Sequence, residues 1–160
     1  MKHISLQYVF LVATAVRCYM HAFALLLGSV VSHSWASGRV TKAQKIVTYF
    51  NASHKPLALF RAALAEQPGS SKAGLVTSNT TRLTSTQLCA SSVLKNQGTF
   101  ASMLAKPGGK EAVRNAEVLE LVQDLHFFGD LRLLDAVLQP ISWVIMGVQR
   151  QTTTMADVAR

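Results

Sequence analysis

Residues 117–128 read Glu-Val-Leu-Glu-Leu-Val-Gln-Asp-Leu-His-Phe-Phe and form the longest amphipathic segment of the chain. Apolar side chains repeat at helical spacing along one side, at Val118, Leu121, Val122, Leu125 and Phe128. Glu117, Glu120 and Asp124 line the other side, where a charged stripe is ordinarily a solvated surface rather than a metal-binding cluster. The pattern predicts a helix that packs on a core through one face, and a protein of the mainly α class.

The segments on either side of this stretch also have helical patterns. Toward the C-terminus, Pro140 is placed to open a further helix, and residues 154–157 (Thr-Met-Ala-Asp) resemble a capping box. Toward the N-terminus, the pattern predicts a helix from about Thr84 to Leu104, bent near Gly98. Loops are expected near residues 67–74 and 106–110, where Pro and Gly cluster.

The first third of the chain carries a second helical stripe. The apolar residues of this stripe repeat at helical spacing and are Val40, Ala43, Val47 and Phe50. The neighbouring Lys42 and Lys45 point to other sides of the predicted helix. Residues 32–38, which include Trp35, look like a break in helical structure. Residues 19–31 are apolar nearly all round, which is typical of a helix buried in a core.

The N-terminal residues allow two interpretations. Residues 8–12 (Tyr-Val-Phe-Leu-Val) are β-branched and aromatic, which favours a short buried strand. Residues 4–16 also have the outline of a secretory signal, which would make this a small secreted or membrane-associated protein. A membrane span is disfavoured because Arg17 interrupts the apolar run. Cys18 and Cys89 fit a reduced intracellular protein or, in a secreted one, a single disulfide.

Charge is distributed unevenly along this chain of 160 residues and formal net charge +8. Residues 1–65 hold seven Lys and Arg and no acid, whereas from Glu111 onward seven acids stand against four bases. The basic first part indicates an anionic partner, such as nucleic acid or a membrane surface, with a solvated basic surface as the alternative. The candidate DNA-contacting residues are Arg39, Lys42, Lys45 and Arg82.

One pair of residues has a spacing found in metal sites. Cys18 and His21 form a CxxH pair that could give two zinc ligands, but a structural zinc site needs four. Because positions i and i+3 share a helix face, a Cys and a His packed in a core are the simpler interpretation. We therefore assign no catalytic residue and expect no metal, cofactor or small-molecule substrate.

Several segments, in order along the chain, resemble those of hAT-superfamily DNA transposases. Residues 17–27 (Arg-Cys-Tyr-Met-His-Ala-Phe-Ala-Leu-Leu-Leu) resemble the family's CxxH segment, in which a strand leads into C-x-x-H and a Leu-rich helix. Residues 31–51 resemble the helices that follow, and residues 78–85 resemble the T-R-W-x-S landmark. Residues 137–142 and 154–158 resemble helical segments beyond it.

The resemblance has consequences for the organisation of the chain. It implies that residues 1–17 carry the last strand, about 8–12, of a ribonuclease-H-like core. It implies that residues 18–160 belong to the helical region inserted in that core. It also implies a nuclear protein, with DNA and other transposase chains as partners; the alternative interpretation of the N-terminus would instead place the protein outside the cell.

The resemblance also bears on activity. A complete family member carries an acidic triad that binds Mg²⁺ or Mn²⁺, with two Asp before the CxxH segment and a Glu after the helical region. This chain has no acid before Glu66, so we expect a catalytically incomplete fragment, not an enzyme, with at most residual DNA or protein binding. Leu83 stands in place of the landmark Trp, and Leu cannot stack on a base. Arg82 is retained, either to contact a phosphate or to pair within the fold.

If the basic residues contact DNA, binding should depend strongly on salt, because each phosphate contact releases condensed counterions. We predict that the affinity for a short labelled duplex, measured by fluorescence anisotropy, falls steeply between about 50 and 200 mM salt. An affinity that is unchanged over this range would contradict phosphate contacts by Arg39, Lys42, Lys45 and Arg82.

Overall fold

The computed structural model describes residues 21–67, 74–79 and 84–158, with the side chains of residues 148–158 excepted. Within these ranges the chain is mainly helical and contains no strand, so the predicted class is confirmed. The expected strand at residues 8–12 lies outside the described residues, as do Cys18 and Arg82.

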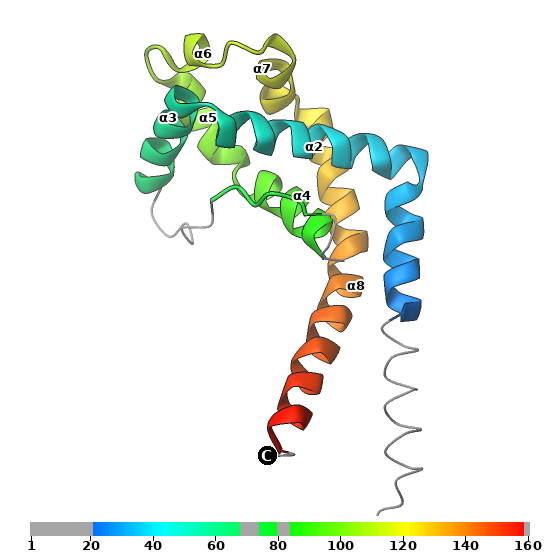
Figure 1. Cartoon of the computed structure of the whole chain (residues 1–160). Helices are drawn as coiled ribbons and strands as arrows, with labels where there is room; N and C mark the ends of the chain where they lie inside the picture. The colour runs from blue at the N-terminus through cyan, green and yellow to red at the C-terminus, as the bar shows by residue number, and fades with distance from the viewer. Residues whose placement is uncertain (1–20, 68–73, 80–83, 159–160) are drawn as a thin grey trace, which may run out of the picture.

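The described helices follow one another with short connections (Figure 1). An unlabelled helix covers residues 21–32. It is followed by α2 (Ser34–Ala52), α3 (His54–Ala65), α4 (Ser85–Lys95), α5 (Gln97–Ala105), the short α6 (Gly109–Ala112), α7 (Ala116–Gln123) and the long α8 (Leu125–Val158).

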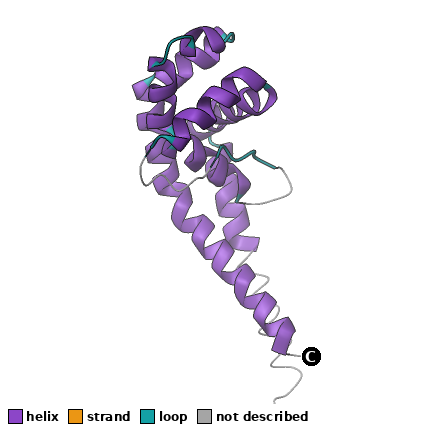
Figure 2. Cartoon of the chain, turned by 90° about the vertical axis from the view of Figure 1, so that its left-hand side faces the viewer, coloured by secondary structure: helices purple, strands orange, loops and turns teal. Residues whose placement is uncertain are grey.

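The helix α2 occupies the centre of the arrangement, because it packs on α3, α4, α7 and α8. At one end of α2, α5 packs on α3, α6 and α7, and this group forms the head of the molecule (Figure 1). At the other end, α8 and the helix of residues 21–32 leave the head in the same direction, as both views show (Figures 1 and 2). The shape is therefore a compact head from which two helices project.

Three phenylalanines form the centre of the head. Phe50 of α2, Phe60 of α3 and Phe100 of α5 are each at most 1% exposed. Their ring centroids lie 5.7 Å apart for Phe50–Phe60 and 5.2 Å apart for the other two pairs, within the range of favourable aromatic contacts. The predicted stripe of α2 that ends at Phe50 is buried along its whole length, at Val40, Ala43, Val47 and Phe50.

The amphipathic segment of residues 117–128 is two helices rather than one. Asp124 has an extended backbone conformation (ψ 104°) that ends α7. Its carboxylate accepts a hydrogen bond of 2.8 Å from the backbone N–H of His126, so Asp124 caps the first turn of α8. Val118, Leu121, Val122 and Phe128 are buried as predicted, but the prediction for Leu125 is wrong, since the break leaves this side chain 74% exposed.

The helix α8 runs through Pro140, so the prediction that Pro140 opens a separate helix is wrong. A proline inside a helix removes the hydrogen bond to the carbonyl four residues earlier. That carbonyl belongs to Ala136, and both Ala136 and Pro140 are exposed, so the freed carbonyl lies on a side of the helix where water can reach it. Residues 154–157 lie within α8, and therefore no helix begins there.

Two expectations for the N-terminal third need correction. The helix of residues 21–32 is not buried all round, because Leu25 and Leu26 are exposed and only Leu27 belongs fully to the core. The break expected over residues 32–38 is confined to His33, whose side chain accepts a hydrogen bond of 3.3 Å from the backbone N–H of Trp35 and caps α2.

Two further boundaries depend on single residues. The helix predicted from about Thr84 to Leu104 divides at Asn96 into α4 and α5. The loop expected near residues 106–110 closes into α6, and its glycines are required there: Gly108 has φ +74°, and a Cβ on Gly109 would lie 2.1 Å from the carbonyl oxygen of Met103.

We predict that Phe100→Ala lowers the free energy of unfolding by about 3–5 kcal/mol, because it leaves a cavity among three buried rings. Leu88→Ala, which truncates an apolar side chain that is 40% exposed on α4, is the matched control and should cost less than about 1 kcal/mol. Urea unfolding followed by circular dichroism measures both. Equal losses would contradict the placement of the aromatic cluster at the centre of the head.

Candidate functional site

Arg39, a candidate DNA contact, is held within the fold. Its Nη2 and Nε lie 2.7 and 3.0 Å from one carboxylate oxygen of Asp130 at the start of α8. Its Nη1 donates to the backbone oxygen of Trp35 at 3.0 Å, and the guanidinium carbon lies 4.9 Å from the centroid of the Trp35 ring. The Arg39 side chain therefore joins α2 to α8, with its charge compensated by a carboxylate and stacked on an indole.

The other described candidate DNA contacts, Lys42 and Lys45, follow Arg39 at three-residue spacing on α2 but differ from it in their partners. The ammonium of Lys45 forms an ion pair with the carboxylate of Glu117 on α7. Lys42 is exposed on α2, and no ion pair of Lys42 occurs within the described part of the chain. Arg82 lies outside the described residues. The structure thus uses Arg39 and Lys45 to link helices and leaves Lys42 turned to solvent.

Five of the described carboxylates have a partner within the fold. Besides Asp130 and Glu117, Glu66 pairs with Lys106, Asp124 caps α8, and Asp135 accepts a hydrogen bond of 2.8 Å from Nε2 of Gln87. Among the described residues, no three His, Cys, Asp or Glu side chains are placed to share a metal ion. His21, one half of the CxxH pair, is exposed at the first described position, and its partner Cys18 is not described.

Cys89 on α4 is a free thiol that is 1% exposed. Burial raises the pKa of the Cys89 thiol above its ordinary value of 9.0, and a backbone hydrogen bond from Ser78 lowers it by less. A thiol of raised pKa is protonated at neutral pH and is a poor nucleophile. Cys89 is therefore suited to packing in the core rather than to catalysis.

The largest exposed apolar side chains gather on the projecting helices. On α8, beyond Leu125 in its first turn, they are Leu133, Val137, Trp143 and Val144, of which Trp143 is 64% and Leu133 62% exposed. We call these four residues the α8 apolar face. The helix of residues 21–32 adds Leu25 and Leu26. Exposed apolar surface of this extent is typical of an interaction site.

A shallow groove connects the two projecting helices. It is lined by Val30 of the first helix, by Trp35 at the start of α2, and by Leu134 and Val137 of α8. The groove thus borders the α8 apolar face at Val137, and Val30 belongs to the helix that also carries Leu25 and Leu26. Both helices project from the head (Figure 2). None of the helices in the described ranges combines the length and apolar character needed to cross a bilayer.

Sequence reasoning missed this surface, although a signal was present. Residues 136–149 contain no Asp, Glu, Lys or Arg, which is unusual for a helix with a solvated side. Ile141, Val144 and Ile145 follow Pro140 at helical spacing, but Val144 is exposed and Ile145 is fully buried, and Trp143 before them is exposed as well. Because apolar residues occur on both sides of this part of α8, the pattern alone did not say which side the core would cover.

Comparisons with protein-family models, with curated proteins and with solved structures give no match. The assignment of a function therefore depends on the residues themselves and on the surfaces that they form.

We predict that burial of Cys89 makes stability depend on alkaline pH. A thiol whose pKa is higher in the folded than in the unfolded state contributes stability that is present below pH 9.0 and is lost as pH rises toward the folded-state pKa. The free energy of unfolding of the wild type should therefore fall more between pH 8 and pH 10 than that of Cys89→Ala, measured by urea titration. Parallel pH dependences in the two proteins would contradict the burial of the thiol.

Proposed function

We propose that this chain is a non-catalytic helical interaction module that pairs with a second copy of itself through the α8 apolar face. We further propose that it derives from a hAT-like DNA transposase. The observation that carries the first proposal is the exposure of Leu133, Val137, Trp143 and Val144 on one projecting helix.

The spacing of the exposed residues along α8 supports pairing of the α8 apolar face with an equally long surface. Leu133, Val137 and Val144 are separated by four and seven residues and therefore lie along one side of the helix, with Trp143 beside Val144. A side chain as large as Trp, exposed near the middle of an apolar surface, is typical of the residues that dominate binding energy at protein interfaces.

The distribution of charge favours a second copy as the partner. The chain has a formal net charge of +8, so two copies repel each other over most of their surfaces. Residues 136–149 hold no charged side chain, and hence this part of α8 can meet its own equivalent without like-charge repulsion. In a two-fold dimer, the same patch of each copy meets its equivalent, so the patch must be complementary to itself. An uncharged apolar patch meets this requirement.

The proposed origin rests on the resemblance of residues 17–27, 31–51 and 78–85 to segments of hAT transposases. In this proposal the described helices correspond to the helical insertion, and residues 8–12 are the last strand of the ribonuclease-H-like core. Strand cleavage would require Mg²⁺ or Mn²⁺ held by carboxylates outside this chain, and DNA would be at most a secondary ligand. Sequencing the transcript through both ends tests the origin: a frame that continues into two Asp-bearing strands upstream supports it, and a frame that continues into an unrelated domain contradicts it.

The pairing proposal makes a direct prediction for mass in solution. The full chain should dimerise in a concentration-dependent way, and Trp143→Ser should weaken the dimer by at least about tenfold, because it removes the largest apolar contact. Size-exclusion chromatography with light scattering measures the mass.

Leu88→Ser is the matched control, because it removes an exposed apolar side chain from α4 instead of α8. It should leave dimerisation unchanged. A wild-type chain that stays monomeric at every concentration, or a loss of pairing that is equal in the two variants, would contradict the proposal.

A further inference from the structure

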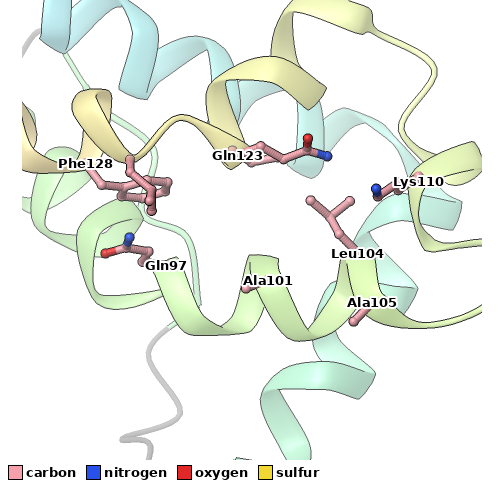
Figure 3. Close-up of a pocket in the computed structure, with 9 residues that line it drawn as sticks. Gln97, Ala101, Leu104, Ala105, Lys110, Gln123 and Phe128 are labelled. Carbon is pink, nitrogen blue, oxygen red and sulfur yellow. The ribbon is translucent and has the colours of Figure 1, made fainter.

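A second site lies on the head and shares no residue with the α8 apolar face. It is a cavity of about 400 Å³ between α5, α6, α7 and the first turn of α8 (Figure 3). This volume is near the lower end of the range of small-molecule sites, which is roughly 300–1,000 Å³. The cavity is therefore large enough for one small ligand.

The wall of the cavity is mainly apolar. Leu104 of α5, Val122 of α7 and Phe128 of α8 line it and belong to the buried core. Ala101 and Ala105, one turn apart on α5, also line it, and their small side chains leave the space open. Leu125 contributes an apolar side chain that is 74% exposed. The apolar surface that a ligand would remove from water belongs to Ala101, Ala105 and Leu125, which are exposed.

The polar groups of the cavity are few and are placed apart. Lys110 of α6 lies at one end, and Phe128 lies at the other (Figure 3). Gln97 and Gln123 add two side-chain amides. No acid lines the cavity, and no ion pair of Lys110 occurs among the described residues.

We propose that this cavity binds an amphipathic monocarboxylate, with its carboxylate on the Lys110 ammonium and its apolar body extending over Leu104 and Val122 toward Phe128. A ligand with one negative charge matches one lysine, whereas a polyphosphate would need several cations at the same place. The apolar wall selects a hydrocarbon chain or ring over a sugar, because a sugar would leave its hydroxyl groups without hydrogen-bond partners there.

The exposed Leu125 fits the same proposal. The break at Asp124 that starts α8 turns Leu125 out of the core, to the rim of the cavity. An apolar side chain at that position can cover the hydrocarbon part of a bound ligand. The two sites share no residue, so the monocarboxylate proposal does not depend on pairing through α8.

Decanoate, titrated below its micelle concentration into the full ¹⁵N-labelled chain, is the test ligand. We expect saturable binding with one site per chain, and shifts of amide resonances centred on residues 97–105 and 122–128. Decyltrimethylammonium has the same chain length and the opposite charge, and should bind at least about fivefold more weakly because its charge is repelled by Lys110.

Three variants sharpen the test. Lys110→Gln should weaken decanoate binding by about five- to tenfold, since it removes the charged partner of the carboxylate. Lys42→Gln makes the same change of charge at an exposed position of α2 and should leave the affinity unchanged. Ala101→Trp should abolish binding by filling the cavity; if that variant does not fold, Ala105→Leu takes its place.

Three results would overturn the proposal: equal affinities of decanoate for Lys110→Gln and Lys42→Gln, equal binding of the cationic and anionic ligands, or shifts that do not saturate. Because the pairing of chains is measured separately by mass, failure of this proposal would leave the proposed function standing, and the reverse also holds.

Discussion

The arrangement of the molecule depends on one long helix that is apolar on two sides. One side of α8 is fully buried, at Leu131, Leu134, Leu138 and Ile145, where α2 and α4 pack against the helix. Burial of side chains of this size contributes about 1.5–3 kcal/mol each, so this contact is a large part of what holds the two central helices in place. The other side, with Leu133, Val137, Trp143 and Val144, is exposed and is the surface that we propose for pairing.

Two basic residues of α2 form ion pairs that link it to neighbouring helices. Arg39 joins α2 to Asp130 of α8, and Lys45 joins α2 to Glu117 of α7. Each pair is partly solvated and therefore adds at most about 1 kcal/mol, so these contacts orient helices that apolar burial already holds together. Their effect on function is larger, because they leave Arg39 and Lys45 with compensated charges. Among the described candidate DNA contacts, Lys42 remains the exposed one.

The sequence predicted what depends on local periodicity. The stripe from Val40 to Phe50 is buried because residues three and four apart share one face of α2, whatever packs against it. The sequence could not predict features that depend on one helix-capping residue or on contacts between residues far apart in the chain. Asp124 starts a new helix and so exposes Leu125, and the partner of Arg39 lies 91 residues further along the chain. The cavity beside Lys110 is formed by four helices and has no signature in any one segment.

The exposure of Trp143 gives the most direct test of pairing through α8. In a Trp35→Phe chain, which keeps an aromatic ring beneath Arg39, Trp143 is the remaining tryptophan and its fluorescence reports the α8 apolar face alone. We predict that its emission moves to shorter wavelength as the protein concentration rises, because pairing removes the indole from water. Emission that stays at the wavelength of a solvated indole at every concentration would contradict the account.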